Sequence, residues 1–594
     1  MDSEINHQLL TRALLKLRQS MIEAERSQRE QIASTHPENR ESLRNLVHYL
    51  AMRRRDLHEV QLQLAALGLS SLGRSEGFVL DNLNRVLHYL GAEEGPETSL
   101  DWAMAERLLH RNTRALLGEH PSDRHVLIMI TSPMPDEADA SWMEKSLRAG
   151  MNVLRINCAH GTESDWEKLI AALREAEKTT GLSCRLLMDI AGPKLRTGPV
   201  HGGAEILRLR VERDIFGRLA KPARVTVGSE NSDLIFPKEF CAQMRAGDTL
   251  QFRDSRGKKR RIRIDTEGKG FVGLCDSGAC ILRETRFTLR RGKKEVAQAD
   301  CGALPFVPGS LLLKRDDLLV LFAGEGEGFP AESTEPGVPP VHARIGCTLG
   351  EAVAAIRPGE RVLFDDGKIG AVCVSSQPGE ALLRIVRAKD SGSRLRGEKG
   401  INLPDSQLRI PAITEKDRQD LVFVLQQADL VGASFIHSAA DVAELQSIVT
   451  GAPRKPGILL KIETQAGFQN LPEILTQALV QSPVGVMIAR GDLAVEAGFE
   501  RLAEVQEEIL WVCEAAHVPV VWATQVLENL AQTGQPSRAE ITDAAMSVRA
   551  ECVMLNKGPY IHEATTALTN ILKKMEKHQY KKRSLYRPLQ IGLG

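Results

Sequence analysis

Two short apolar runs in the last quarter of the chain end in charged residues that could do chemistry together. The run ILLKIE places Lys461 and Glu463 two positions apart, and therefore on one face of a strand. The run VMIARGDL adds Arg490 and Asp492. Carboxylate oxygens are ligands that Mg²⁺ accepts, and a Lys beside such an ion can neutralise charge on a phosphoryl group in transfer. Together the two runs predict a site for a divalent metal and a phosphorylated substrate, rather than ordinary charged strand ends.

Composition limits the class of protein. The 594 residues are too many for one hydrophobic core, so several domains are expected. Lys plus Arg and Asp plus Glu balance at 77 each, which gives no bulk attraction to nucleic acid or to an anionic membrane. Ten Cys without a CxxC pair are typical of reduced thiols in a cytosolic protein. The polar N-terminus and the lack of a long uncharged apolar run complete the expectation of a soluble, cytoplasmic protein that binds neither nucleic acid nor membrane.

The first 120 residues form a region with helical periodicity. Apolar residues recur there at three- and four-residue spacing, and no cluster of catalytic residue types accompanies them. We predict an N-terminal helical region over 1–120 that packs on the rest of the chain or mediates assembly.

From about residue 121 the pattern changes to short apolar runs that alternate with helical stretches. Three such runs occur in 121–198 and five more in 391–580, and strand alternating with helix is typical of parallel strands with crossover helices. Eight of them predict an α/β fold, a (β/α)8 TIM barrel, whose chemistry lies at the C-terminal ends of the strands. Polar residues occur at those ends: Arg155, Asn157, Asp189, Ser434, Lys461, Glu463, Asp492, Thr524, Gln525 and Asn556.

The interruption at 199–390 has the short alternating runs of an antiparallel β domain, inserted after the third barrel strand. An internal duplication is one interpretation of this domain, because AGDTLQFRD at 246–254 is similar to PGERVLFDD at 358–366. Its basic runs could attract nucleic acid, but no aromatic residues interleave with them, so a solvated β face is the better interpretation. A basic tail occupies 581–594.

Eight motifs in order make the chain resemble the pyruvate kinase family. They are SLRAGMNVLRINCAHG (146–161), MDIAGPKLRTG (188–198), FDDG (364–367), EKGINLP (398–404), VGASFI (431–436), LKIE (460–463), IARGDL (488–493) and ATQVLE (523–528). The resemblance covers roughly 125–570, and the family also has a barrel with a β domain inserted after the third strand. It implies a phosphotransferase of glycolysis that moves the phosphoryl group of phosphoenolpyruvate to ADP, giving pyruvate and ATP.

The resemblance also implies roles for individual residues. Arg155 is similar to the arginine that contacts the transferring phosphoryl group, and Lys461 to the lysine that stabilises this group and the enolate oxygen. Glu463 and Asp492 match the ligands of Mg²⁺, for which Mn²⁺ can substitute. Substrate contacts are implied for Arg155, Lys461, Asp492, Gly491 through its backbone, and Thr524 near the carbon that is protonated. Nucleotide contacts are implied for Arg196, Lys399, His160, Ser132, Pro135 and Asp366, the last in the inserted domain that could close as a lid.

One ion site departs from the family pattern. Asn157, Asp189 and the carbonyl of Ile190 match three ligands of the family's monovalent cation, but Ala159 stands where a Ser ligand is expected. Lys194 stands where potassium-dependent members have Glu, and its ammonium carries the same charge as K⁺. We predict that Lys194 supplies the charge internally and that K⁺ is not required. A merely degraded site is the alternative.

Further departures concern regulation. The motif after the eighth strand reads NKGPY at 556–560, where the family has Ser-Gly-Glu-Thr, and little sequence follows that could form the family's C-terminal regulatory domain. Activation through that domain is therefore not expected. We expect the protein to form a homo-oligomer. A barrel enzyme acting on another enol or keto acid, and a non-catalytic regulatory derivative, remain as alternative functions.

Overall fold

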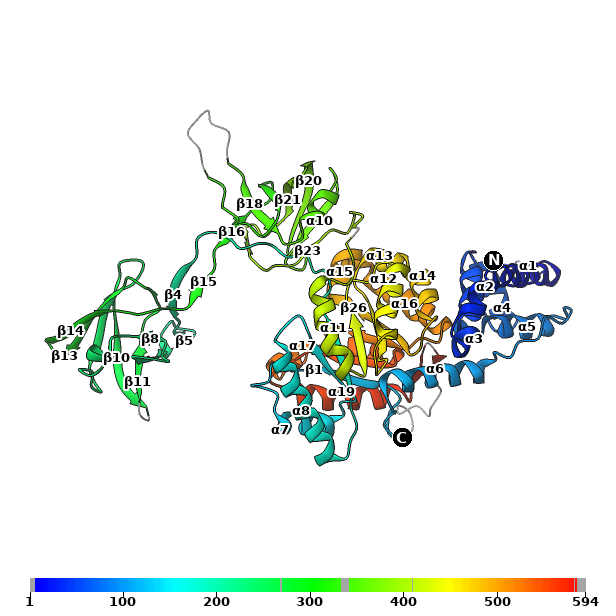
Figure 1. The fold of residues 1–594 in the computed structure, drawn as a ribbon, viewed down its shortest axis with the longest axis horizontal. Helices are drawn as coiled ribbons and strands as arrows, with labels where there is room; N and C mark the ends of the chain where they lie inside the picture. Colours follow the sequence, from blue (N-terminus) through cyan, green and yellow to red (C-terminus); the bar gives the residue numbers. More distant parts are fainter. Residues whose placement is uncertain (1–5, 268–269, 333–340, 409, 582, 585–594) are drawn as a thin grey trace. The chain divides into compact units, whose positions relative to one another are not determined.

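The computed structural model describes residues 6–267, 270–332, 341–408, 410–581 and 583–584 (Figure 1). The chain divides into two compact units, Met1–Lys194 with Asn402–Gly594, and Leu195–Ile401. The sequence predicts an insertion at 199–390 between the two barrel segments. Most of the predicted basic tail, namely 582 and 585–594, lies outside the described residues. Among the helices that are described, none combines the length and the apolar character needed to cross a lipid bilayer.

The first unit contains a closed barrel of eight parallel strands, which confirms the predicted (β/α)8 fold. In barrel order the strands are β1 (Leu127–Thr131), β2 (Val153–Asn157), β3 (Arg185–Ile190), β24 (Leu430–Ala433), β25 (Gly457–Ile462), β26 (Val484–Ala489), β27 (Val520–Ala523) and β28 (Cys552–Leu555). The helices between and after them are α7 (Ala140–Ala149), α8 (Glu163–Thr180), α11 (Glu415–Gln427), α12 (Ala439–Thr450), α13 (Gln465–Gln469), α14 (Leu471–Ala478), α15 (Arg490–Ala497), η3 (Phe499–Arg501), α16 (Leu502–Ala515), α17 (Glu528–Thr533), α18 (Arg538–Met546), η4 (Ser547–Arg549) and α19 (Ile561–Met575). A short hairpin, β29 (Gln579–Tyr580) and β30 (Arg583–Ser584), follows.

Local sequence signals fix where several barrel helices begin. Thr162, Thr414, Ser438 and Ser537 each cap a helix, and an acidic residue three positions later bonds back to the cap. This reciprocal arrangement satisfies backbone N–H groups that the first helical turn leaves without partners. The capping boxes therefore set the start of helices α8, α11, α12 and α18.

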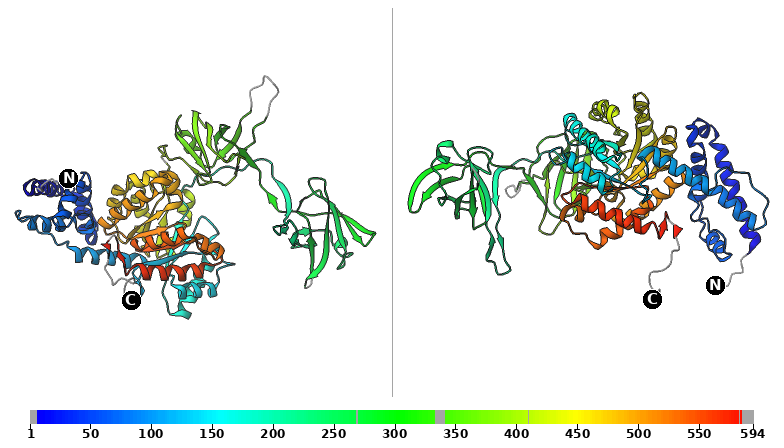
Figure 2. Two further views of the ribbon diagram at one scale, coloured as in Figure 1. Left: turned by 180° about the vertical axis from the view of Figure 1, so that it is seen from behind. Right: turned by 90° about the horizontal axis from the view of Figure 1, so that it is seen from below.

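The N-terminal helices lie beside the barrel in the same unit (Figures 1 and 2). They are α1 (His7–Ser27), α2 (Arg29–Ser34), η1 (Pro37–Asn39), α3 (Arg40–Arg53), α4 (His58–Ala66), η2 (Glu76–Phe78), α5 (Val79–Tyr89) and α6 (Trp102–Leu117). Buried hydrogen bonds join them to the barrel helices: Asn45 donates to the Ala515 carbonyl at 2.8 Å, and the His517 ring lies 3.0 Å from Ser42 Oγ and 2.9 Å from the Gly77 carbonyl. Because these groups would be costly to bury without partners, the contact is a specific one.

The end of helix α6 contributes to the barrel interior. Leu116 and Leu117 belong to the apolar cluster formed by the inward-facing residues of all eight strands. Gly457 and Gly485 make room for this contact, because a Cβ at either position would lie 2.6 or 2.4 Å from a methyl group of Leu116. The helix that precedes the first strand therefore closes part of the barrel core.

The second unit is built of mainly antiparallel sheets. We call its residues 204–307 the first β lobe and 310–401 the second β lobe. The first lobe contains β4 (Ala204–Leu209), β5 (Glu212–Arg213), β6 (Leu219–Lys221), β7 (Ala223–Gly228), β8 (Leu234–Ile235), α9 (Lys238–Cys241), β9 (Thr249–Arg253), β10 (Lys259–Glu267), β11 (Gly270–Cys275), β12 (Ala279–Leu282), β13 (Arg286–Arg291), β14 (Lys294–Asp300) and β15 (Phe306–Val307). Its main sheet has the order β14-β13-β9-β10-β11-β7-β8.

The second lobe is centred on a six-stranded sheet. Its elements are β16 (Ser310–Leu313), β17 (Leu318–Ala323), β18 (Ala343–Cys347), α10 (Gly350–Ala355), β19 (Arg361–Phe364), β20 (Ile369–Gln377), β21 (Glu380–Arg387), β22 (Ser393–Arg396) and β23 (Ile401–Asn402). The sheet order is β18-β17-β21-β20-β19-β23, and β16 pairs with β22 separately. Among the described strands of the second unit, only the pairs β7–β8 and β17–β18 are parallel.

The two similar sequence segments adopt the same turn in the two lobes. Gly247 and Gly359 have φ of +87° and +91°, a left-handed conformation that favours glycine. In each lobe the next residue, Asp248 or Glu360, accepts with its carboxylate from the backbone N–H three positions earlier, at 2.9 Å. The N–H of Gly247 donates to the carbonyl of Ile264 in β10, and the N–H of Gly359 donates to the carbonyl of Cys373 in β20. This shared geometry supports a duplication, which remains a prediction.

Candidate active site

A buried carboxylate at the C-terminal end of β3 holds two cations. Arg155 Nε, from β2, donates to Asp189 Oδ2 at 2.9 Å, and a second guanidinium nitrogen donates to the same oxygen. Lys461 Nζ, from β25, lies 3.3 Å from that oxygen. The cations also donate to hydroxyls, Arg155 to Thr131 at 3.1 Å and Lys461 to Ser434 at 2.8 Å. Polar strand ends that are far apart in the sequence thus form one network.

The protonation states of this network follow from burial and charge. Burial alone would raise the pKa of Asp189, but the charges of Lys461 and Arg155 outweigh it and hold the pKa below its usual value. Burial alone would lower the pKa of Lys461, and the carboxylates of Asp189 and Glu463 outweigh it and raise that pKa. Lys461 is therefore an ammonium at neutral pH, as a group that neutralises phosphoryl charge must be.

The second carboxylate oxygen of Asp189, Oδ1, differs from the first in its hydrogen bonding. Oδ1 is buried and has no hydrogen-bond partner among the residues that the structure describes, which is costly for a carboxylate. Gly432, on the neighbouring strand β24, gives it room, because a Cβ there would lie 2.5 Å from Oδ1. An orphaned carboxylate oxygen of this kind is suited to a cation or a donor that binds in the site.

Two further carboxylates, Glu463 and Asp492, stand beside this network. Glu463 directly follows β25, and its Oε1 lies 3.1 Å from Lys461 Nζ while its Oε2 accepts from the Phe435 N–H at 2.7 Å. Burial raises the pKa of Glu463, Lys461 opposes this, and the negative charge of Asp492 raises it further. A buried carboxylate whose ionisation is opposed by a neighbouring carboxylate fits a divalent cation, whose charge would relieve the repulsion.

Few side chains at this site could bind a metal ion. Among the residues that the structure describes, no group of three or more His, Cys, Asp or Glu side chains is arranged to hold a metal ion. A pair of carboxylates suits Mg²⁺, which keeps several waters and takes further oxygens from a phosphorylated substrate.

Asp492 lies in the first turn of helix α15 rather than at the end of a strand, and its partner is Lys194. The Lys194 Nζ lies 3.2 and 3.0 Å from the two oxygens of Asp492. The predicted internal cation thus bonds to a predicted metal ligand. Of the predicted monovalent-cation ligands, the Asn157 side chain accepts from the Ala159 N–H at 3.2 Å, and the Ile190 carbonyl accepts from Ser434 Oγ at 2.8 Å.

The loop after β27 has a strained backbone that presents Thr524. Thr524 and Gln525 have φ of +72° and +59°, values that are uncommon for residues with a side chain. Arg490 holds this loop, since it donates to the carbonyls of Ala523 and Thr524 at 2.8 and 2.5 Å and is itself bonded to Asp543. Arg490, which the sequence suggests as a site cation, therefore acts as a positioning residue.

Gly491, between Arg490 and Asp492, faces the same loop. A Cβ at Gly491 would lie 3.1 Å from Thr524 Cγ2, so a side chain here would crowd the threonine.

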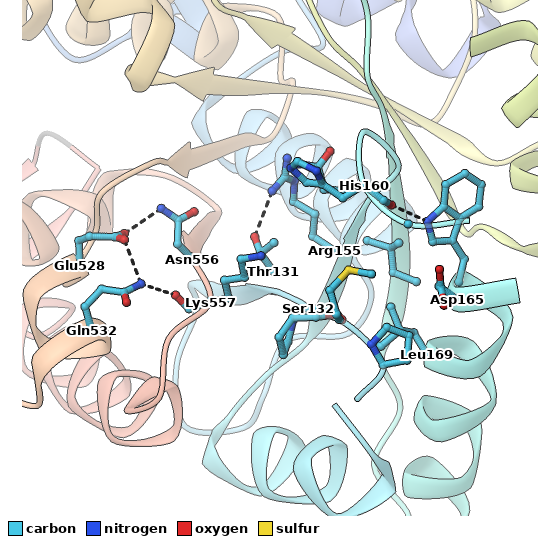
Figure 3. A pocket seen from close by; sticks show the side chains of 17 residues that line it. Thr131, Ser132, Arg155, His160, Asp165, Leu169, Glu528, Gln532, Asn556 and Lys557 are labelled. Atoms are coloured by element: carbon cyan, nitrogen blue, oxygen red, sulfur yellow. Dashed lines mark hydrogen bonds between the residues drawn. The ribbon is translucent and has the colours of Figure 1, made fainter. Parts of the chain in front are cut away.

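A pocket of about 290 Å³ opens next to Arg155 (Figure 3). It brings together Ser132, Pro135 and His160, which the sequence assigns to nucleotide binding by resemblance. The opposite wall comes from helix α17 and from the loop after β28, where Glu528 accepts from Asn556 at 2.8 Å. The remaining lining residues are Thr131, Pro133, Met134, Ile156, Asn157, Gly161, Asp165, Trp166, Leu169, Gln532 and Lys557.

Sequence reasoning missed the contribution of Glu528, Gln532 and Thr131 to this pocket. Glu528 ends the ATQVLE motif, which was the one available signal. The side chains of Asn556 and Gln532 make contacts that depend on how helix α17 meets the loop after β28.

Three predicted nucleotide contacts lie in the second unit. Arg196 donates to the Glu398 carbonyl at 3.2 Å, and Lys399 Nζ lies 3.0 Å from Asp365 Oδ1. Asp365 and Asp366 both have positive φ, 50° and 54°, in the tight turn between β19 and β20. These residues belong to the second unit, whereas Arg155, Lys461, Glu463 and Asp492 belong to the first unit.

Comparison with known proteins agrees with this geometry. A family model described as the pyruvate kinase barrel domain matches residues 124–260 and 342–564. The pyruvate kinase of Dictyostelium discoideum is 34% identical over 478 residues, which cover 79% of this chain and 70% of that protein. The pyruvate kinase of Corynebacterium glutamicum is 33% identical over 437 residues, 73% of this chain and 65% of that protein.

Other matches are shorter. Pyruvate kinase 1 of Trypanosoma brucei brucei is 37% identical over 224 residues, which span 36% of this chain and 43% of that protein. The matches range from less than half to about two thirds of the relatives' own lengths, and the family model covers more than half of this chain. With the closed barrel and the charged network at its C-terminal end, the comparisons lead to one conclusion: the chain belongs to the pyruvate kinase family.

Proposed function

We propose that this protein is an active pyruvate kinase of glycolysis that transfers the phosphoryl group of phosphoenolpyruvate to ADP. The observation that supports this most is the Arg155–Asp189–Lys461 network, which lies beside the pocket lined by Ser132 and His160. A buried lysine and a partly buried arginine beside a pocket that holds the nucleotide-binding residues implied by the resemblance suit a phosphorylated substrate on one side and an acceptor phosphate on the other. A regulatory derivative would not need to retain the buried charges.

The reaction breaks the bond between phosphorus and the enol oxygen and forms a bond from phosphorus to a β-phosphate oxygen of ADP. Arg155 and Lys461 neutralise charge on the phosphoryl oxygens during transfer, and Lys461 stabilises the enolate oxygen that remains. The enolate then takes a proton at its methylene carbon, near the hydroxyl of Thr524, and pyruvate results. Asp189 acts as a positioning residue, because it fixes both cations.

Glu463 and Asp492 are the residues that would hold Mg²⁺, or Mn²⁺ in its place. When bound there, the ion supplies a Lewis acid that offsets phosphoryl charge. The backbone of Gly491 contacts the substrate carboxylate, and its lack of a side chain keeps Thr524 accessible. Ser132, Pro135 and His160 contact the nucleotide in the first unit. The family resemblance also implies phosphate contacts for Arg196, Lys399 and Asp366, which belong to the second unit.

The enzyme works without K⁺, because Lys194 brings a fixed positive charge to the site. Its ammonium stands 3.0 Å from a carboxylate oxygen of Asp492. A titration of activity with KCl in a choline chloride background tests this proposal. Activity that changes by less than about twofold supports the internal cation, and a large activation by K⁺ contradicts it while leaving the reaction itself intact.

The reaction is tested by pyruvate formation from phosphoenolpyruvate and ADP with Mg²⁺, in the wild type and in Lys461→Met. The matched control is Lys168→Met, which removes an exposed lysine of helix α8. We expect activity in the wild type and the control, and a loss of at least about a thousandfold in Lys461→Met. Equal activity in all three proteins would mean that Lys461 does not act on the phosphoryl group.

A further inference from the structure

A basic pocket lies on the exposed face of the first β lobe, which the proposed reaction does not use. It has a volume of about 460 Å³, within the range of small-molecule sites. Strands β9, β10 and β13 supply most of its lining: Gln251, Phe252, Arg253, Lys259, Arg260, Arg261, Arg286 and Thr288, with Asp276 and Ser277 from a neighbouring loop. Five cations and one carboxylate line it, so its net charge is strongly positive.

Cross-strand register places these cations in neighbouring rows. Lys259 pairs with Arg253, and Arg261 pairs with Gln251, which in turn pairs with Thr288 of β13. Residues directly opposite each other in antiparallel strands have side chains within about 5.5 Å, so the positive groups converge with hydroxyl and amide donors between them.

Some of the cations are already neutralised and others are not. Arg260 donates to the buried Asp254 at 3.1 Å, and Arg286 binds Asp300 through two hydrogen bonds. The side chains of Lys259 and Arg261 make no hydrogen bond or ion pair with any residue that the structure describes. Both are exposed. Like charges held on adjacent strands without counter-charges destabilise a sheet, so their presence calls for an anionic ligand.

The lobe as a whole has the same character. Residues 204–300 contain 22 Lys and Arg against 14 Asp and Glu, a net charge of +8 in a chain whose total is zero. Such an asymmetry concentrates positive potential on one part of the molecule and attracts multivalent anions.

We propose that this pocket binds a small molecule that carries two or more clustered phosphate groups. Arg253, Lys259 and Arg261 bind the phosphate oxygens, and Gln251 and Thr288 donate hydrogen bonds between them. The pocket favours a compact ligand over single-stranded nucleic acid because it presents no aromatic ring on which bases could stack. The Phe residues of these strands, Phe252 and Phe287, are 4% and 0% exposed and face the core.

The test is calorimetric titration of the full-length chain with sodium tripolyphosphate at low salt, with a hexose bisphosphate and ATP as separate arms. The pocket variant is Lys259→Gln/Arg261→Gln. The matched control is Lys293→Gln/Lys294→Gln, which removes the same charge from the exposed β13–β14 turn of the same sheet, outside the pocket. All three proteins keep the barrel residues, so differences between them report on the lobe alone.

We expect the pocket variant to bind tripolyphosphate about tenfold or more weakly than the wild type, and the control to stay within about twofold. A charge-preserving Lys259→Arg/Arg261→Lys variant should recover most of the binding, which separates loss of charge from loss of fold. Of tripolyphosphate, the hexose bisphosphate and ATP, the compound that binds most tightly shows which kind of phosphorylated molecule the pocket prefers.

Equal tripolyphosphate binding by all three proteins would overturn the proposal. It would also be overturned if a 15-nucleotide single strand bound to the wild type and lost affinity in the pocket variant while no small phosphate compound did so. Pyruvate formation without the ligand is expected to be unchanged in the pocket variant, so this test stands apart from that of the catalytic reaction.

Discussion

Replacing Asp189 by Asn tests whether the buried carboxylate organises the active site. The substitution keeps the shape of the side chain and removes its charge, so Arg155 and Lys461 lose a shared partner. At the observed 3.3 Å between Lys461 Nζ and Oδ2, and at an effective dielectric constant of about 20, the lost attraction is about 5 kcal/mol. Removing one partner of a buried ion pair costs about 3–5 kcal/mol. We therefore expect the free energy of unfolding to fall by about 3–5 kcal/mol.

The assay is urea unfolding followed by tryptophan fluorescence. All five Trp residues, at positions 102, 142, 166, 511 and 522, lie in the first unit, so the signal reports on the barrel and its N-terminal helices alone. The matched control is Glu444→Gln, which breaks an exposed ion pair with Arg418 and should cost less than about 1 kcal/mol.

The same variant changes the pH dependence of the reaction. Because the charge of Asp189 raises the pKa of Lys461, its removal lowers that pKa, and the alkaline loss of activity should move to lower pH. A variant as stable as the control, with an unchanged alkaline limb, would refute the view that Asp189 fixes the two cations.

Two further changes test the contact between the N-terminal helices and the barrel. Leu116 is 1% exposed, so Leu116→Ala opens a cavity and should lower the free energy of unfolding in urea by about 2–5 kcal/mol. The control Leu62→Ala, at an exposed position, should lower it by less than about 0.5 kcal/mol. Equally small losses in both variants would contradict the packing role of Leu116. Burial lowers the pKa of His517 to about 4, below its unfolded value, so the stability it contributes is present above about pH 6.5 and is lost as pH falls towards 4. The wild type should lose about 2 kcal/mol more than His517→Gln between pH 7.5 and pH 5, and identical pH profiles would refute this assignment.

The sequence predicted the barrel because strand and helix periods alternate visibly along the chain. It also predicted that Lys461 and Glu463 would act together, because residues two positions apart on a strand share a face. In the structure, Lys461 Nζ and Glu463 Oε1 lie 3.1 Å apart. By contrast, the role of Asp189 as the partner of two cations depends on contacts across strands that are up to 272 residues apart in the chain. No local pattern contains that information.

Other features were predicted only in part. The sequence suggested Arg490 as a cation of the site, but in the structure its planar guanidinium holds two carbonyls of the loop that presents Thr524. The position of Lys194 suggested an internal cation. Its bond to Asp492 could not be read from spacing, because Lys194 lies in the segment after β3 and Asp492 lies in the first turn of helix α15, 298 residues later. Leu116, in the last turn of an amphipathic helix, gave no sign that it enters the barrel interior.

The most direct measurement of the central claim follows the phosphorus atom itself. Phosphoenolpyruvate and ADP are incubated with the protein and Mg²⁺, and ³¹P NMR records where the phosphoryl group goes. We expect the γ-phosphate signal of ATP to replace the phosphoenolpyruvate signal, and Lys461→Met to abolish this change. A folded wild-type protein that leaves phosphoenolpyruvate intact, or that converts it to inorganic phosphate without forming ATP, would contradict the account.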